Sequence, residues 1–171
     1  TLSHYYCLEA GQTLEQFEAD LEAAITLAGR KGIALRSIVF PRNQYDPSHV
    51  EICRRHGITR FRGTPRQWAY QAAPGADQTP LRRAVRLLDA HTGVLGDTSF
   101  AASDTDAGDV PASQFLRPCS GKLAVGHPLH RRAIRRGMTR AARTGRSYHL
   151  WWHPHNFGRD MEDNMRSLKD I

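Results

Sequence analysis

A chain of 171 residues with 40% hydrophobic content is long enough to bury one core and is ordinary for a globular protein, so its composition argues against disorder throughout. It has no stretch close to the roughly 18 apolar residues that a membrane span needs, and no secretory leader pattern is visible. The net charge of +7 suits an anionic partner such as nucleic acid, a membrane surface or an acidic glycan.

The three cysteines, Cys7, Cys53 and Cys119, are far apart and odd in number. This spacing indicates neither a disulfide framework nor a thiolate zinc site. It favours a reducing compartment such as the cytoplasm. Any targeting segment of a longer protein would lie upstream of Thr1.

The first two predicted helices have clear start signals. The run Thr13-Leu14-Glu15-Gln16 is typical of a capping box, and apolar residues follow at helical spacing until Gly32. A second helix is predicted from an Asp46 cap, with Pro47 in its first position, to Gly57. Between and after these helices, residues 33–40 and 58–61 are predicted to be buried strands of a parallel sheet.

The rest of the chain continues the alternation. A helix is predicted from Thr79 to about His91, with one apolar face, and an exposed loop over residues 96–113. An arginine-rich helix over about 128–144 leads to a strand over 147–152 and a final helix that carries Met161, Met165 and Leu168. Alternating strands and helices predict an α/β fold with a parallel sheet or a partial β/α barrel. We interpret residues 1–171 as a single domain, with residues 71–127 as an insertion or irregular region within it.

Three short runs lie where a predicted strand meets a loop, which is where layered α/β proteins assemble their sites. They are Thr1-Leu2-Ser3-His4, Phe40-Pro41-Arg42-Asn43 and Leu150-Trp151-Trp152-His153. His4 lies four residues after the position that precedes Thr1. Two histidines at that spacing share a helical face and can bind one metal ion.

These runs together resemble motifs of the polysaccharide deacetylase (NodB-homology) family. Thr1 to His4 is similar to the end of its H-[ST]-x-x-H metal motif, and Leu150 to His153 is similar to its last motif, a hydrophobic strand that ends in His. The strand before Arg42 and the helix that ends at His56 follow in the family's order. The resemblance covers roughly residues 1–70 and 146–171, and the middle of the chain is not covered.

The resemblance implies a deformed β/α barrel that binds zinc or a similar divalent ion through one Asp and two His. It also implies hydrolysis of N-acetyl, or sometimes O-acetyl, groups on a sugar or polysaccharide. His4 matches one metal ligand, and His153 matches the acid that protonates the departing amine. His155, two residues further on, could compete with His153 for that role, and a hydrogen-bonded loop histidine is the structural alternative.

The remaining candidate residues surround the implied substrate. Arg42 matches the arginine that holds a catalytic carboxylate ionised, displaced by one position, and an exposed arginine is the alternative. Asn43 follows it and is expected beside the substrate. Trp68 matches a tryptophan that walls the substrate groove, although the family's preceding acidic residues are absent and a core role is equally open. Of Trp151 and Trp152, which alternate along a strand, one is expected to face the site and the other to pack on a helix.

The family's first motif, an Asp pair upstream of the metal motif, has no counterpart in this sequence. The chain therefore retains one metal ligand of three. We expect it to be an inactive N-terminally truncated piece whose intact parent is a hydrolase.

Two other functions remain open. The seven arginines between Arg131 and Arg146 could make the chain a nucleic-acid-binding module, although they spread around much of the helix and no nucleic-acid motif accompanies them. A basic solvated face is the commoner reason for such a cluster. A catalytically dead homologue that only binds glycans is the third possibility.

Overall fold

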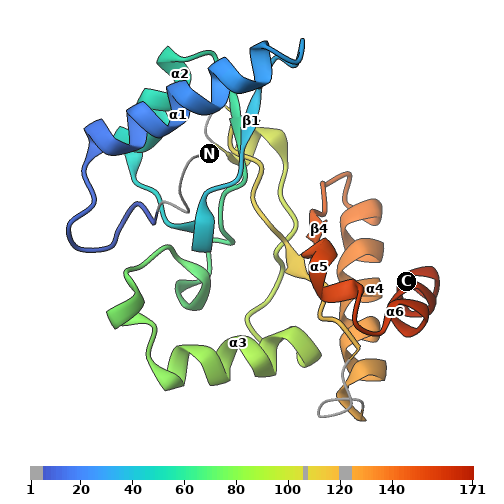
Figure 1. Ribbon diagram of the computed structural model, residues 1–171. Helices are drawn as coiled ribbons and strands as arrows, with labels where there is room; N and C mark the ends of the chain where they lie inside the picture. Colours follow the sequence, from blue (N-terminus) through green and yellow to red (C-terminus); the bar gives the residue numbers. More distant parts are fainter. Residues whose placement is uncertain (1–5, 106–107, 120–124) are drawn as a thin grey trace. The chain divides into compact units, whose positions relative to one another are not determined.

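The computed structural model describes residues 6–105, 108–119 and 125–171. It shows a mixed α/β fold, mostly helical, with short parallel strand pairs (Figure 1). The chain divides into two compact units. Unit 1 comprises Thr1–Thr64, Gln71–Thr79 and Asp106–Val110, and unit 2 comprises Pro65–Tyr70, Pro80–Thr105 and Pro111–Ile171.

The two helices of unit 1 begin where the sequence predicts. Helix α1 (Leu14–Gly29) carries the full capping box, in which Thr13 Oγ1 accepts from the Gln16 backbone N–H. Helix α2 (Pro47–Arg55) begins after Asp46, whose carboxylate accepts from the Ser48 and His49 backbone N–H groups. The chain leaves α2 through Gly57, whose φ of 78° is a left-handed conformation that glycine adopts without steric cost.

The strands of unit 1 are parallel, as predicted, but much shorter. Strand β1 (Ser37–Ile38) pairs with β2 (Arg60–Phe61), with Ser37 opposite Arg60, and Phe61 forms a further parallel bridge to Asp109. The predicted buried run does not extend through Val39, which is 54% exposed, whereas Phe40 is fully buried. The run is covered on one side only, and a 3-10 turn, η1 (Pro41–Asn43), follows at once. A second such turn, η3 (Gly75–Asp77), also belongs to unit 1.

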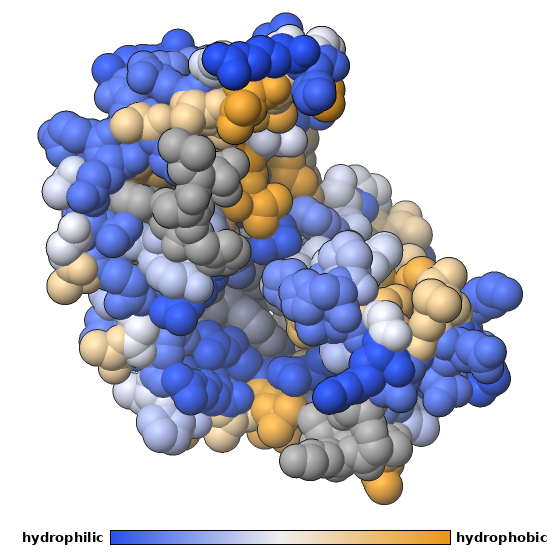
Figure 2. Space-filling view, viewed as in Figure 1, coloured by the Kyte–Doolittle hydropathy of each residue, from blue (hydrophilic) through white to orange (hydrophobic). Residues whose placement is uncertain are grey.

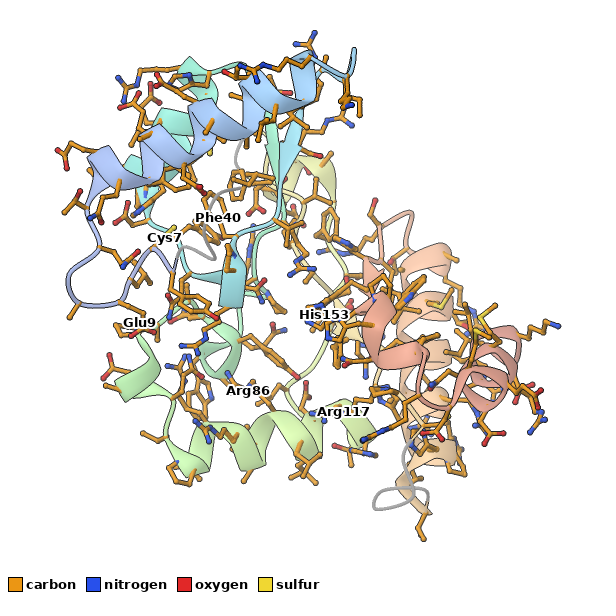
Figure 3. All side chains as sticks on the ribbon, in the orientation of Figure 1. Cys7, Glu9, Phe40, Arg86, Arg117 and His153 are labelled. Carbon is orange, nitrogen blue, oxygen red and sulfur yellow. The ribbon has the colours of Figure 1, made fainter. Side chains whose placement is uncertain are left out.

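Aromatic rings form the centre of unit 1. The Phe40 ring stacks on Phe17 with centroids 6.0 Å apart and on Tyr45 at 5.0 Å, and it meets the Phe61 ring edge-on at 6.1 Å. Figure 1 shows α1 and α2 side by side next to β1, and Figure 3 labels Phe40 in this region. The apolar sides of both helices therefore close over one ring cluster.

Unit 2 contains the remaining elements. These are η2 (Trp68–Tyr70), α3 (Pro80–Thr92), η4 (Ala102–Asp104), β3 (Gln114–Phe115), α4 (His127–Arg143), β4 (Leu150–Trp151), α5 (Pro154–Phe157) and α6 (Met161–Lys169). Strands β3 and β4 pair in parallel, with Phe115 opposite Trp151. Each strand pair is a separate two-stranded sheet, so the described residues form no barrel.

Three predicted features differ from the structure, the first of them in α3. The predicted apolar face of α3 is largely exposed, with Leu81 67% and Leu88 55% accessible, while Asp89 and Ala90 are buried. Asp89 is buried because it accepts from the Tyr70 hydroxyl and from the Leu95 backbone N–H.

The segment 96–113 is not simply an exposed loop. Phe100 forms an antiparallel bridge to Ser147. Several residues of the segment are buried, namely Ser99, Ala112 and Ser113. The final helix is present as α6, but its predicted apolar residues Met161 and Met165 are exposed. Asn164 and Ser167 form its buried face.

Unit 2 is centred on a small apolar cluster, Leu116, Ile134 and Phe157, beside the buried His130. The Arg117 backbone N–H donates to His130 Nε2 at 3.1 Å, so Nδ1 carries the proton that is donated to the Ala90 carbonyl at 2.6 Å. Burial lowers the pKa of His130 to about 4. The ring is therefore neutral at pH 7 and serves as a structural hydrogen-bond bridge.

Exposed hydrophobic side chains occur in small groups on the face seen in Figure 2, which is otherwise mainly hydrophilic. Within the part of the chain that the structure describes, no helix combines the length and the hydrophobicity needed to cross a membrane.

Candidate functional site

Three of the predicted site residues meet where β4 ends. The Trp151 ring lies 4.6 Å from that of Phe115 and meets the His153 ring edge-on at 5.3 Å, and His153 stacks on His155 at 5.2 Å. Figure 3 labels His153 at the start of α5. Because β3 and β4 are parallel, Phe115 and Trp151 lie in register at the same sheet edge. We call Phe115, Trp151, His153 and His155 the aromatic-imidazole cluster.

The two imidazoles of this cluster are exposed and Trp151 is half-buried. The two imidazoles are therefore accessible to solvent beside an apolar surface. Trp152 lies outside the cluster and stacks on Phe157 of α5 at 5.7 Å. The alternation of Trp151 and Trp152 thus separates one indole at the cluster from one that packs on a helix.

Sequence reasoning missed Phe115. Its strand is two residues long, which is too short for an alternating pattern to be visible, and its partner Trp151 is 36 positions further along the chain. Only the parallel pairing brings the two rings together.

Arg42 and Asn43 belong to unit 1 and share an uncommon backbone conformation. Both have a φ of 54°, the left-handed region that side chains other than glycine rarely adopt. Each such residue costs about 1 kcal/mol or more, and such residues gather at functional sites. The turn after Phe40 therefore holds two strained polar residues side by side.

The side chain of Arg42 is held by a carboxylate that sequence reasoning did not single out. Glu9 Oε1 accepts from Arg42 Nη1 at 3.3 Å, from Gln44 Nε2 at 2.8 Å and from the Gly75 backbone N–H at 2.9 Å. The Gln44 hydrogen bond, followed by the Gly75 N–H, lowers the pKa of Glu9. Figure 3 labels Glu9 in this region.

Two further contacts fix this turn. The Arg42 guanidinium lies 4.0 Å from the centroid of the Tyr6 ring, a cation–π contact. Asn43 Oδ1 accepts from Arg62 Nη2 at 2.9 Å. Both predicted residues are thus oriented by neighbours, and no local sequence pattern could reveal partners 19 to 36 positions away.

Trp68 lies in η2 of unit 2 and is 50% exposed, so its indole is not core. Its backbone carbonyl accepts from Arg82 Nη2 at 2.9 Å, which ties the turn to α3. The side chain presents a flat apolar face to solvent.

The predicted metal ligand His4 lies outside the described residues. Among those that the structure describes, Glu18, Glu22 and His56 could hold a metal ion, because their ligand atoms lie within 4.8 Å of one another. His56 Nε2 is 2.8 Å from Glu18 Oε1, which Arg55 also contacts at 3.4 Å. This set comes from α1 and the end of α2, not from strand ends, and it does not fit the implied Asp and two His.

Compared with family models, curated proteins and solved structures, the chain matches none of them. The fold and the two groups of residues thus define a mixed α/β protein with candidate sites after β1 and β4.

Proposed function

We propose that this chain is part of a metal-dependent hydrolase that removes acetyl groups, N-acetyl in the first place, from a sugar or polysaccharide. The single observation that carries the proposal is the aromatic-imidazole cluster at the carboxyl end of β4. The ordered set of motifs, with its resemblance to polysaccharide deacetylases, gives the chemistry. For the intact parent the resemblance implies a deformed β/α barrel, whereas the described residues form two separate parallel strand pairs.

His153 has the central role in this proposal. A sugar amine leaves poorly unless it is protonated, and an imidazole ordinarily titrates near neutrality, so it can donate that proton. The exposed ring of His153 stands between Trp151 and His155, which restrict its orientation from two sides. His155 is the competing donor.

The aromatic side chains supply binding surface. Trp151 and Phe115 offer an apolar surface beside His153, of the kind that can receive an acetyl methyl group. The exposed indole of Trp68 suits the apolar face of a sugar ring. Arg42 and Asn43 lie in unit 1, and for them the resemblance implies a role in orienting a polar group, which is proposed separately from the cluster of unit 2.

Zinc is the proposed metal, but its ligands are not assigned among the described residues. The group Glu18, Glu22 and His56 differs from the implied donors in type and in position, so it is not the zinc site of this proposal. The chain's own contribution is therefore proton donation by His153 and binding by the aromatic rings.

The test is acetate release from an N-acetylglucosamine oligosaccharide by the natural full-length protein, with zinc supplied. We expect His153→Ala to lower kcat by about 100-fold or more, since a general acid contributes on that order. His155→Ala tests the competing donor, and a larger loss of kcat in this variant than in His153→Ala would assign the proton donation to His155 instead. Absence of acetate release by the wild-type protein, or an unchanged kcat in His153→Ala, would contradict the proposal.

A further inference from the structure

The basic helix α4 borders a cavity of about 770 Å³ in unit 2. The other walls come from the end of α3, the segment 93–98, Gln114 of β3 and Tyr148. Small-molecule sites commonly measure about 300–1,000 Å³. The cavity thus has the size of a small-molecule site, and it lies outside the aromatic-imidazole cluster.

One row of arginines faces this cavity. Arg132, Arg136, Arg140 and Arg143 recur every three or four residues, so they lie on one side of α4, and all four line the cavity. Like charges at this spacing destabilise a helix by a few tenths of a kcal/mol per pair, and α4 contains no acidic residue that could offset them. The row is an uncompensated local charge.

Within the described part of unit 2, the arginines of this row differ from their neighbours in the chain. Arg132, Arg136 and Arg143 form no hydrogen bond or ion pair there. The charge of Arg140 helps to lower the pKa of Asp97, but the two side chains form no ion pair. By contrast, Arg131 Nε lies 4.0 Å from Asp170, and Arg146 Nη2 lies 2.9 Å from Asp104. Arg135 also lines the cavity, but its Nη1 donates to the Asp170 carbonyl at 3.3 Å, so among the described residues the cavity arginines without a hydrogen bond or ion pair are those of the row.

Gly137, Tyr148 and Gln114 in the cavity wall are tightly packed, and the polar groups of Tyr148 and Gln114 are hydrogen-bonded within the protein. A Cβ at Gly137 would lie 2.5 Å from the Tyr148 ring, so the ring occupies space that only glycine leaves free. The Tyr148 hydroxyl donates to Gln114 Oε1 at 2.6 Å, and Gln114 Nε2 donates to the Ala90 carbonyl at 2.9 Å. A glycine inside a helix destabilises it by about 1 kcal/mol relative to alanine, so the close packing of Tyr148 on Gly137 has an energetic cost.

The two carboxylates that line the cavity are engaged as well. Asp89 accepts from the Tyr70 hydroxyl and the Leu95 N–H, each at 2.7 Å, and Asp97 accepts from the Ser99 N–H at 2.9 Å. Five arginines, the fifth being Arg135, stand against these two acids in the lining. The cavity therefore offers a ligand mainly unpaired positive charge.

We propose that this cavity binds a small molecule that carries two or more phosphate groups. The planar guanidinium can bind a phosphate through two parallel hydrogen bonds, and residues four apart on a helix are separated by about 6 Å along its axis. Two such arginines can thus each bind one phosphate. The size of the cavity favours a small ligand over nucleic acid, and its single aromatic ring packs on Gly137, so it offers no platform for stacked bases. The inference is independent of acetyl hydrolysis.

Calorimetric titration of the full chain at low salt tests this proposal, with tripolyphosphate as the first probe and ATP and a sugar bisphosphate as the next. We expect saturable one-to-one binding that weakens as NaCl is added. The double variant Arg132→Gln/Arg136→Gln should weaken binding by about tenfold or more, because two charge-assisted contacts are lost. The affinity of Arg136→Lys should lie between those of the wild type and the double variant, since lysine keeps the charge but cannot form two parallel hydrogen bonds. If ATP or the sugar bisphosphate binds more tightly than tripolyphosphate, the tighter of the two indicates which organic group the natural ligand carries.

Arg83→Gln is the matched control, because Arg83 is an exposed arginine of α3 outside the cavity lining. It should leave the affinity unchanged within about twofold. Absence of saturable binding, or an equal loss in the control, would show that only the overall basic charge acts and would overturn the proposal. Tighter binding of single-stranded DNA, with an affinity that grows with its length, would also overturn it in favour of an extended polyanion.

Discussion

Each of the two units of this protein is stabilised internally by a different kind of contact. Unit 1 buries a ring cluster around Phe40 and a larger set of apolar side chains. Unit 2 has a buried apolar cluster of Leu116, Ile134 and Phe157, and it relies on buried polar groups such as His130 and Asn164. Apolar burial is non-directional and insensitive to protonation, whereas a buried hydrogen-bond network depends on geometry and on charge. The two units should therefore respond differently to mutation and to pH.

The largest expected effect tests the aromatic core of unit 1. Phe40→Ala removes a fully buried ring that contacts three others, and it should destabilise unit 1 by about 3–5 kcal/mol. Urea denaturation followed by hydrogen exchange of α1 and α2 amides would measure the loss. The neighbouring Val39→Ala, at a position that is 54% exposed, should change stability by less than about 0.5 kcal/mol. Equal losses in the two variants would argue against a core centred on Phe40.

The next effect tests the polar core of unit 2. The pKa of His130 is about 4 in the folded protein, against 6.5 for a free imidazole. The unfolded chain therefore binds more protons between these values, so stability is complete above about pH 7 and falls as the pH is lowered toward 4. We expect a loss of about 2–3 kcal/mol over this range in unit 2. The lowered pKa of His127, which is due to burial and then to Arg131, acts in the same direction.

Hydrogen exchange of α3 and α4 amides as a function of pH would measure this loss. In unit 1 the lowered pKa of Glu9 stabilises the fold above the ordinary value of 4.5, so that contribution disappears only below about pH 4.5. His130→Leu should remove most of the pH dependence of unit 2 between pH 7 and 4. A variant that keeps the full wild-type slope would show that His130 is not its source.

A smaller effect separates local from tertiary stabilisation. Thr13→Ala removes the side-chain bond to the Gln16 N–H in the capping box of α1, and it should cost about 1 kcal/mol. Thr13→Ser keeps the hydroxyl and should be close to wild type. Helix α4 has no such side-chain cap, since Gly126 precedes it and a Cβ there would lie 2.8 Å from the His91 ring. Thermal denaturation of both variants checks the size of the effect, and identical melting temperatures would refute it.

The smallest effect concerns the surface of unit 2. Arg166 Nη1 lies 2.9 Å from Asp163 Oδ1, but both side chains are more than half exposed. Solvent and salt screen such a pair, so Arg166→Ala should cost less than about 0.5 kcal/mol. The urea midpoint in low and in high salt gives the measurement. A loss above about 1 kcal/mol would mean that the arginine has a packing role that its exposure does not suggest.

Part of the fold could be read from the chain because the signals are local. The caps at Thr13 and Asp46, the end of α2 before Gly57 and the extent of α4 depend on residues within about four positions of one another. The parallel pairing of short strands also follows from the alternation of strands and helices. Where local patterns failed, as for the apolar face of α3, the burial of Asp89 by Tyr70 and Leu95 determined which side faces inward.

The candidate sites divide in the same way. Sequence alone pointed to His153, His155 and Trp151, which are neighbours in the chain and meet in one cluster. Tertiary structure alone supplied Phe115 as a partner of Trp151. It also supplied Glu9, which binds both Arg42 and the Gly75 N–H, although Glu9 and Gly75 are 66 positions apart in the chain. It also decided which arginines of α4 face a cavity. The physical reason is that helix caps and turns form between adjacent residues, whereas pairing, burial and cavity walls depend on which distant segments fold together.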